Sequence, residues 1–276
     1  MDDRRNGGAA ADALALPAGV TPASLAWRVE ETCLNAWPAL RQVLLGGWVL
    51  RFSQGLTRRA NSANPLKGHR ELGGDFIAAC EAFYQRQQLP TIFRVPSIIG
   101  ADLDERLEAL GYGRKGESLV LYGEMAGLAR ANDPAVQLLP RPTSAWLAAM
   151  AALQNHTTEV SRTYRRIVRA IAIPAAFAAL PVDGRLAALA YGAVHDGLLC
   201  YESVITDPRR QRRGYSRRVI TRLAAWAKEQ GAEGACLQVE ARNAAALALY
   251  DTVGLKTELY RYHYRLQATD PAVTKM

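Results

Sequence analysis

An arginine-rich loop with a single glycine, residues 207–216, is the part of this sequence best equipped to bind an anion. It reads Asp-Pro-Arg-Arg-Gln-Arg-Arg-Gly-Tyr-Ser and joins an apolar stretch of strand character to a long stretch of helical period. A pyrophosphate needs several convergent N–H donors and close approach of the backbone, and a glycine-containing loop at a helix N-terminus supplies both. Gly214 removes the Cβ from the place where a phosphate would sit, and Arg212 and Arg213 supply neutralising charge. The loop therefore predicts a site for a nucleotide-like polyanion.

The same arginine cluster has a second interpretation, because a basic helix start can bind nucleic acid or simply be solvated. The net charge of +8 favours anionic partners of either kind. Two observations favour the phosphate site. The cluster opens a helix directly after a strand, and the basic residues are not interleaved with aromatic ones as in many nucleic-acid-binding segments. We therefore expect no nucleic-acid partner.

Most of the chain after residue 21 has the period of helices or strands. In the first half we expect a helical region at 25–45 broken by Pro38, a strand at 47–53, a helix at 73–88, a strand at 91–95, a helix at 103–110 and a strand at 117–122. In the second half we expect a strand at 136–139, helices at 143–154 and 161–171, strands at 176–180, 186–194 and 198–206, a helix at 216–230, a strand at 235–240, a helix at 244–252 and a strand at 259–266. Hairpin strands followed by strand–helix–strand units predict an α/β (α+β) fold, with mixed sheets that carry helices on both faces.

Two blocks in the second half resemble the GNAT superfamily of N-acetyltransferases. Gln211, Gly214 and Ser216 follow the spacing of its acetyl-CoA signature, which is Arg or Gln, two residues, Gly, one residue, then Gly or Ala. The segment from Asn243 to Leu255 is similar to the family's second block, with Asn, Ala, Leu-Tyr and Gly at matching positions. The resemblance covers about residues 136–266, and its spacing is closest to enzymes that acetylate the N-terminal amine of ribosomal proteins.

Three positions depart from the family pattern. Ser216 stands where Gly or Ala is usual, which narrows the space beside the phosphates, and Leu255 stands where Phe is usual. Gln238 occupies the position at which the ribosomal-protein enzymes place a glutamate base. This last departure concerns the acceptor substrate rather than the fold.

The resemblance implies acetyl-CoA as co-substrate, an amine acceptor and no metal. It assigns cofactor contacts to Val204, Ile205, Thr206, Gln211, Arg212, Arg213, Gly214, Tyr215, Ser216 and Asn243. Tyr250 would give a proton to the departing thiolate, and Glu202 is our candidate base for the incoming ammonium. Each has a structural alternative: Tyr250 could be a packed helix residue, Asn243 a helix cap, and Glu202 an outward-facing strand residue.

The first half resembles a degenerate copy of the same fold. Residues 102–112 are similar to the end of a GNAT domain, yet no glycine loop of the required pattern precedes the helix at 73–88. We therefore expect a mobile tail at 1–20, a degenerate GNAT-like domain at 21–131 and a GNAT acetyltransferase domain at 134–268, in tandem. The polar segment 58–65 either binds an anionic or peptide substrate at the interface between the halves or is a solvated turn.

The remaining features set the class of protein. No stretch reaches the roughly 20 apolar residues that cross a bilayer, and residues 1–20 do not resemble a signal peptide, so we expect a cytoplasmic protein without membrane contact. The four cysteines lie far apart in the sequence without metal-ligand spacing, which indicates reduced, buried thiols. The sequence leaves a homodimer open. It also leaves open a non-catalytic acyl-CoA sensor or scaffold as an alternative to the enzyme.

Overall fold

The computed structural model describes residues 21–128 and 133–267. The mobile tail expected at 1–20, residues 129–132 at the boundary between the halves, and the chain after 267 lie outside the described residues. Within the described part of the chain, no helix is both long and apolar enough to span a membrane.

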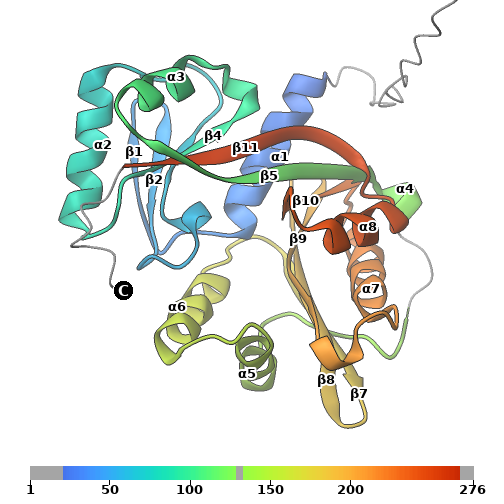
Figure 1. The fold of residues 1–276 in the computed structure, drawn as a ribbon. Helices are drawn as coiled ribbons and strands as arrows, with labels where there is room; N and C mark the ends of the chain where they lie inside the picture. Colours follow the sequence, from blue (N-terminus) through green and yellow to red (C-terminus); the bar gives the residue numbers. More distant parts are fainter. Residues whose placement is uncertain (1–20, 129–132, 268–276) are drawn as a thin grey trace, which may run out of the picture.

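One mixed sheet of eleven strands runs through the whole described chain (Figure 1), which confirms the α/β class. Its order is β1-β2-β3-β4-β11-β5-β10-β9-β8-β7-β6. The strands of the first half are β1 (Arg41–Leu45), β2 (Trp48–Phe52), β3 (Ala63–Pro65), β4 (Ile92–Pro96) and β5 (Gly113–Glu124). Those of the second half are β6 (Gln137–Leu139), β7 (Ala175–Val182), β8 (Arg185–His195), β9 (Leu198–Thr206), β10 (Gly234–Glu240) and β11 (Thr257–Leu266).

Helices cover both faces of this sheet, as the alternation of elements predicts. They are α1 (Pro22–Ala36), α2 (Gly74–Arg86), α3 (Asp102–Ala109), α4 (Met125–Leu128), α5 (Ser144–Leu153), α6 (Thr158–Arg169), α7 (Tyr215–Glu229) and α8 (Ala244–Thr252). Figure 1 shows α5 and α6 on one side of strands β7–β9, and α7 and α8 on the other. The predicted apolar stripe of α7, including Val219, Ile220 and Leu223, is fully buried and fixes this helix against the sheet.

The two halves of the chain exchange strands at the centre of the sheet. β5, the last strand of the first half, lies between β10 and β11 of the second half and pairs antiparallel with both. β11 in turn lies between β4 and β5 of the first half. Each half therefore uses a strand of the other to complete its sheet, and the sheet continues across the boundary expected near residues 132–134.

One expected helical region is wrong in its second part. The helical period over 25–45 continues only to Ala36, and Arg41–Leu45 forms β1. Pro38 cannot continue a helix, and Gly46 and Gly47 (φ +53° and +82°) make the tight turn into β2. A Cβ on Gly47 would lie 2.1 Å from the carbonyl oxygen of His69, so a side chain would not fit there. The three-residue strand β3 was not predicted, because Ala63–Pro65 is too short to carry a strand period.

Candidate active site

The parallel strands β9 and β10 part at the centre of the second half, and we call this opening the fork. Residues 198–200 pair with residues 234–236, and the pair Cys200 and Cys236 closes the ladder. β9 continues to Thr206 and β10 to Glu240 with no further pairing to each other in the described chain. Backbone N–H and C=O groups on the facing edges are therefore left free to bind a ligand that lies between the strands.

A bulge in β9 lies directly beyond the base of the fork. Tyr191 of β8 faces Glu202, whereas Leu189 faces Ile205, so β9 has one residue more than β8 over this stretch. Ser203 adopts a left-handed backbone conformation (φ +53°), and its Oγ accepts a hydrogen bond of 2.9 Å from the hydroxyl of Tyr164 in α6. A bulge of this kind changes the direction of backbone groups. It also precedes Val204, Ile205 and Thr206, the partly buried residues predicted to contact acetyl-CoA.

The arginine-rich loop connects one arm of the fork to α7, as predicted. Gly214 is the N-cap of α7 with φ +76°, a conformation that favours glycine. No atom lies within 4 Å of where its Cβ would be, so the helix N-terminus is open to solvent. Gln211, Arg212 and Arg213 are exposed. The loop thus presents free N–H groups, the positive end of a helix and guanidinium groups on one open surface, which suits a phosphate group.

A hydrogen bond joins the first turn of α7 to the β9 arm of the fork. The Oγ1 of Thr206, at the end of β9, lies 2.6 Å from the Oγ of Ser216 in the first turn of α7. Ser216 is the residue that departs from the Gly or Ala of the family pattern. Its hydroxyl therefore has a local structural role, because it ties the start of α7 to the end of β9.

Glu202 lies inside the protein rather than on an outward-facing strand position. Its side chain is 5% exposed, and its two oxygens accept hydrogen bonds of 2.5 and 2.8 Å from the guanidinium of Arg59. The same guanidinium donates to the side-chain oxygen of Gln238 on β10 at 3.0 Å. Burial alone would lower the pKa of Arg59, but the adjacent Glu202 carboxylate raises it well above its ordinary value. Arg59 of the first half therefore forms an ion pair with β9 and a hydrogen bond with β10, and so contacts both arms of the fork.

Tyr250 lies on α8 with 9% of its surface exposed. Burial, with a smaller contribution from the charge of Glu202, raises the pKa of Tyr250 to about 12. Its hydroxyl is therefore protonated at neutral pH, the state that a proton donor requires. Asn243 caps the same helix, since its side-chain oxygen accepts a 3.1 Å hydrogen bond from the N–H of Ala246.

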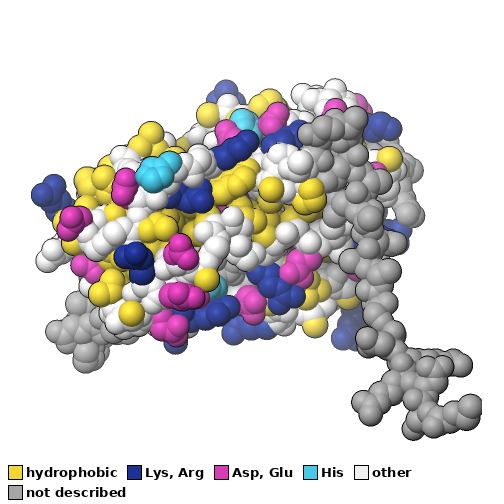
Figure 2. Space-filling view, turned by 90° about the horizontal axis from the view of Figure 1, so that it is seen from above, with side chains coloured by type: hydrophobic (Ala, Val, Ile, Leu, Met, Phe, Trp, Pro, Cys, Tyr) yellow, Lys and Arg dark blue, Asp and Glu magenta, His cyan; other side chains and the backbone are white. Residues whose placement is uncertain are grey.

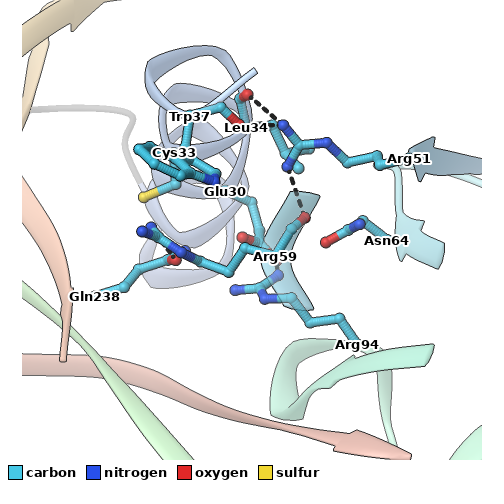
Figure 3. Close-up of a pocket in the computed structure, with 9 residues that line it drawn as sticks. All are labelled: Glu30, Cys33, Leu34, Trp37, Arg51, Arg59, Asn64, Arg94 and Gln238. Atoms are coloured by element: carbon cyan, nitrogen blue, oxygen red, sulfur yellow. Dashed lines mark hydrogen bonds and ion pairs between the residues drawn. The ribbon is translucent and has the colours of Figure 1, made fainter. Parts of the chain in front are cut away.

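A polar cavity of about 10 Å³ lies beside this site, between α1 and the strands of the first half (Figure 3). Its lining residues are Glu30, Cys33, Leu34, Trp37, Arg51, Arg59, Asn64, Arg94 and Gln238. Arg51 donates to the backbone oxygens of Leu34, Trp37 and Arg59. Burial first, and then the neighbouring guanidiniums, lower its pKa to about 10, so Arg51 still carries its charge at neutral pH.

Sequence reasoning singled out segment 58–65 without deciding its role. The solvated-turn interpretation is wrong for most of it, because Ala60 to Pro65 are buried and only Arg58 is well exposed. The signal that could have located Arg59 is the run of polar residues between two buried strands, where unpaired polar groups require partners. The partner Glu202 is 143 residues away in the chain and could not be read from local pattern.

The four cysteines are buried, as predicted, but three of them meet in the fold although they lie far apart in the sequence. Cys33, Cys200 and Cys236 are buried with their sulfur atoms all within 4.8 Å of one another, whereas Cys80 lies in a separate core cluster of the first half. Sequence spacing did not indicate this grouping, because the three residues come from α1, β9 and β10 and meet only through the sheet.

Comparison with known proteins agrees with this architecture. A family model described as "Probable histone acetyltransferase Rv0428c C-terminal" matches residues 25–265. An uncharacterized N-acetyltransferase, YobR of Bacillus subtilis, is 29% identical over 244 residues, which cover 87% of this chain and 98% of that protein. The ribosomal protein bS18-alanine N-acetyltransferase of Salmonella typhimurium is 34% identical over 85 residues, 31% of this chain and 57% of that one.

A solved structure shares the whole fold. The GCN5-related N-acetyltransferase of Kribbella flavida superimposes with a TM-score of 0.67 at 16% identity, over 92% of this chain and 99% of that chain. The family match spans both halves of the sheet, including the first half that was predicted to be a degenerate copy. The chain therefore belongs to the GNAT superfamily of N-acetyltransferases, in the family described by the C-terminal region of Rv0428c.

Proposed function

We propose that this chain transfers the acetyl group of acetyl-CoA to a primary amine of a small molecule, amino acid or peptide, by direct attack of the amine on the thioester. The observation that carries the proposal is the fork between β9 and β10 beside the open N-terminus of α7. The free strand edges suit the amide groups of the pantetheine arm, and the loop at 211–216 suits the phosphates. The predicted contacts of Asn243 and of residues 204–206 and 211–216 belong to this proposal.

Transfer from a thioester to an amine requires a neutral amine, a polarised carbonyl and a protonated leaving thiolate. We assign the polarisation to backbone N–H groups around residues 204–206, where β9 has left β10. Glu202 would take the ammonium proton, directly or through water. Each carboxylate oxygen has more than one acceptor position, so the bond to Arg59 does not exhaust them.

The first half of the chain would then serve the reaction as part of one catalytic unit. Arg59 fixes the Glu202 carboxylate, and β5 completes the sheet between β10 and β11. In this proposal the halves 21–131 and 134–268 are two copies of one fold, and only the second retains a cofactor loop. The boundary is one of sequence similarity, because the sheet itself is shared.

A non-catalytic acyl-CoA-binding protein is the second candidate. The observation that favours it is the bidentate pairing of Glu202 with Arg59, which engages both carboxylate oxygens and so leaves them less available to an incoming amine. A nucleic-acid partner has less support. On the face drawn in Figure 2, the described basic side chains are interspersed with acidic ones rather than gathered into one broad surface.

The substitution Glu202→Gln separates the enzyme from the acyl-CoA-binding protein. We expect kcat to fall about tenfold near neutral pH, with acetyl-CoA affinity retained. This is less than the roughly 100-fold or larger effect of a strong general base, because the bidentate pairing with Arg59 leaves the Glu202 carboxylate less available. Raising the pH should recover part of the loss, because a larger fraction of the amine is then neutral without help. Release of free CoA thiol with a panel of small amines, amino acids and peptides measures this.

The control is Glu240→Gln, which removes an exposed carboxylate at the end of β10, the other arm of the fork. It should leave the rate unchanged. Acetyl-CoA binding without acetylated product from any member of the panel would favour the non-catalytic protein.

A further inference from the structure

Three buried thiols converge at the base of the fork. Cys200 and Cys236 are the last paired residues of β9 and β10, and Cys33 faces them from α1. The sulfur atoms of Cys33 and Cys200 are 3.8 Å apart, and all three sulfurs lie within 4.8 Å of one another. The three side chains are 4% exposed or less. This arrangement joins one helix to both arms of the opening.

The spacing of the sulfur atoms matches the ligand set of a tetrahedral metal ion. A Zn–S bond of about 2.3 Å places the sulfurs of a regular tetrahedron about 3.8 Å apart. The sulfur atoms of Cys33 and Cys200 already have this separation. The other two sulfur–sulfur distances are at most 4.8 Å, so they would shorten by about 1 Å at most on binding. Thiolates select soft ions such as zinc over magnesium or calcium.

The charge around the cluster favours a divalent ion. Three guanidiniums (Arg51, Arg59 and Arg94) lie near Cys33 with two carboxylates, those of Glu30 and Glu202. These five groups leave one positive charge in a largely buried region. A divalent ion bound by three thiolates has a net charge of −1, which balances the net charge of +1 on the five neighbouring groups. A monovalent ion bound in the same way would have a net charge of −2 and would leave one negative charge unbalanced.

A small cavity beside Cys33 is the place from which a fourth ligand would reach an ion bound by the three thiols. The polar cavity of about 10 Å³ is lined by Cys33 and has room for one water-sized group. Buried polar atoms without a protein partner lie on its lining residues, including Glu30 Oε2 and Asn64 Oδ1, so a group bound there would find hydrogen-bond partners.

We propose that Cys33, Cys200 and Cys236 bind a soft divalent cation of the zinc group, with its fourth position toward the polar cavity. Binding exchanges three S–H bonds for three metal–sulfur bonds and releases three protons, with no change of oxidation state. The bound ion would tie α1 to both arms of the fork at the point where the arms separate. Metal occupancy would thereby stabilise the strand geometry on which the cofactor site depends.

Cadmium titration of the purified, reduced chain tests this site, because thiolate-to-cadmium charge transfer gives a near-ultraviolet absorption band. We expect one equivalent of cadmium per chain, and prior loading with zinc should shift the titration to higher cadmium concentration. Cys33→Ala should abolish the band. The matched control is Cys80→Ala, a buried cysteine in the separate core cluster of the first half, and it should bind as the wild type does. Absence of the band in folded wild-type protein, or equal loss in both variants, would overturn the site.

A second measurement uses only the wild-type chain, so a folding defect in a variant cannot confuse it. Zinc should slow alkylation of Cys33, Cys200 and Cys236, read peptide by peptide by mass spectrometry, and leave the rate at Cys80 unchanged. Uniform protection of all four cysteines, or none, would show that these thiols are only core residues. Neither readout depends on acetyl transfer.

Discussion

Replacing Tyr250 with phenylalanine is expected to lower kcat about 100-fold, or about 2.7 kcal/mol in the activation barrier, while acetyl-CoA affinity stays the same. The substitution removes the hydroxyl we assign as proton donor to the departing thiolate, and leaves the buried ring that packs in the core of the second half. Because burial raises the pKa of Tyr250 to about 12, the phenol remains protonated through neutral and mildly alkaline pH. The loss should therefore be nearly constant between about pH 7 and pH 10.

Steady-state rates and calorimetric affinities for the two proteins check this prediction. Tyr112→Phe is the control, since Tyr112 is also buried but bonds to Glu81 in the first half, away from the fork. An unchanged kcat for Tyr250→Phe would remove this residue from the chemistry and leave it as a packed helix residue. A rise in KM without a change in kcat would place it in acetyl-CoA binding instead.

The second large effect concerns stability. Arg94→Met is expected to lower the free energy of unfolding by about 3–5 kcal/mol, because it leaves the carboxylate of Glu30 buried without its counter-charge. Both side chains are 2% exposed. The guanidinium of Arg94 also lies 3.8 Å from the centre of the Tyr262 ring. Burial alone would lower the pKa of Arg94, yet the charge of Glu30 raises it, so Arg94 keeps its positive charge in the folded chain.

Urea denaturation measures this loss as a fall in the midpoint at constant slope. The double variant Glu30→Leu with Arg94→Met should recover most of the stability, because no unpaired charge then remains. The ion pair would be unimportant if Arg94→Met alone cost less than about 1 kcal/mol, which is the range of exposed pairs. Failure of the double variant to recover would instead point to Arg94 stacking on Tyr262 as its main contribution.

Local pattern predicted most of the fold because the second half alternates clear apolar periods with turn residues. β9 and α8 have the predicted bounds, and the bounds of α7 differ by one residue at each end. The exchange of β5 and β11 between the halves could not be predicted. Strand partners are chosen by tertiary packing, and both strands carry the same alternating pattern whichever neighbour they have.

The local structure of the loop at 207–216 could be predicted for a similar reason. Gly214 and its arginines are contiguous in sequence, and one local structure, the start of a helix after a strand, positions them. The environment of Glu202 could not be predicted from the sequence, because its partner Arg59 is 143 residues away in the chain. The three thiols at the base of the fork come from three separate elements, so their spacing in the sequence could not predict that they meet.

Binding of acetyl-CoA at the fork and at the start of α7 is the central claim, and isothermal calorimetry of wild-type protein beside Gly214→Trp tests it most directly. The matched control is Gly231→Trp at the other end of α7, where φ is also positive (+83°) and no atom lies within 4 Å of the added Cβ. We predict micromolar-range binding by the wild type and by Gly231→Trp, and at least a tenfold loss in Gly214→Trp, whose indole would occupy the phosphate position. No binding by folded wild-type protein, or equal weakening in both variants, would contradict the account.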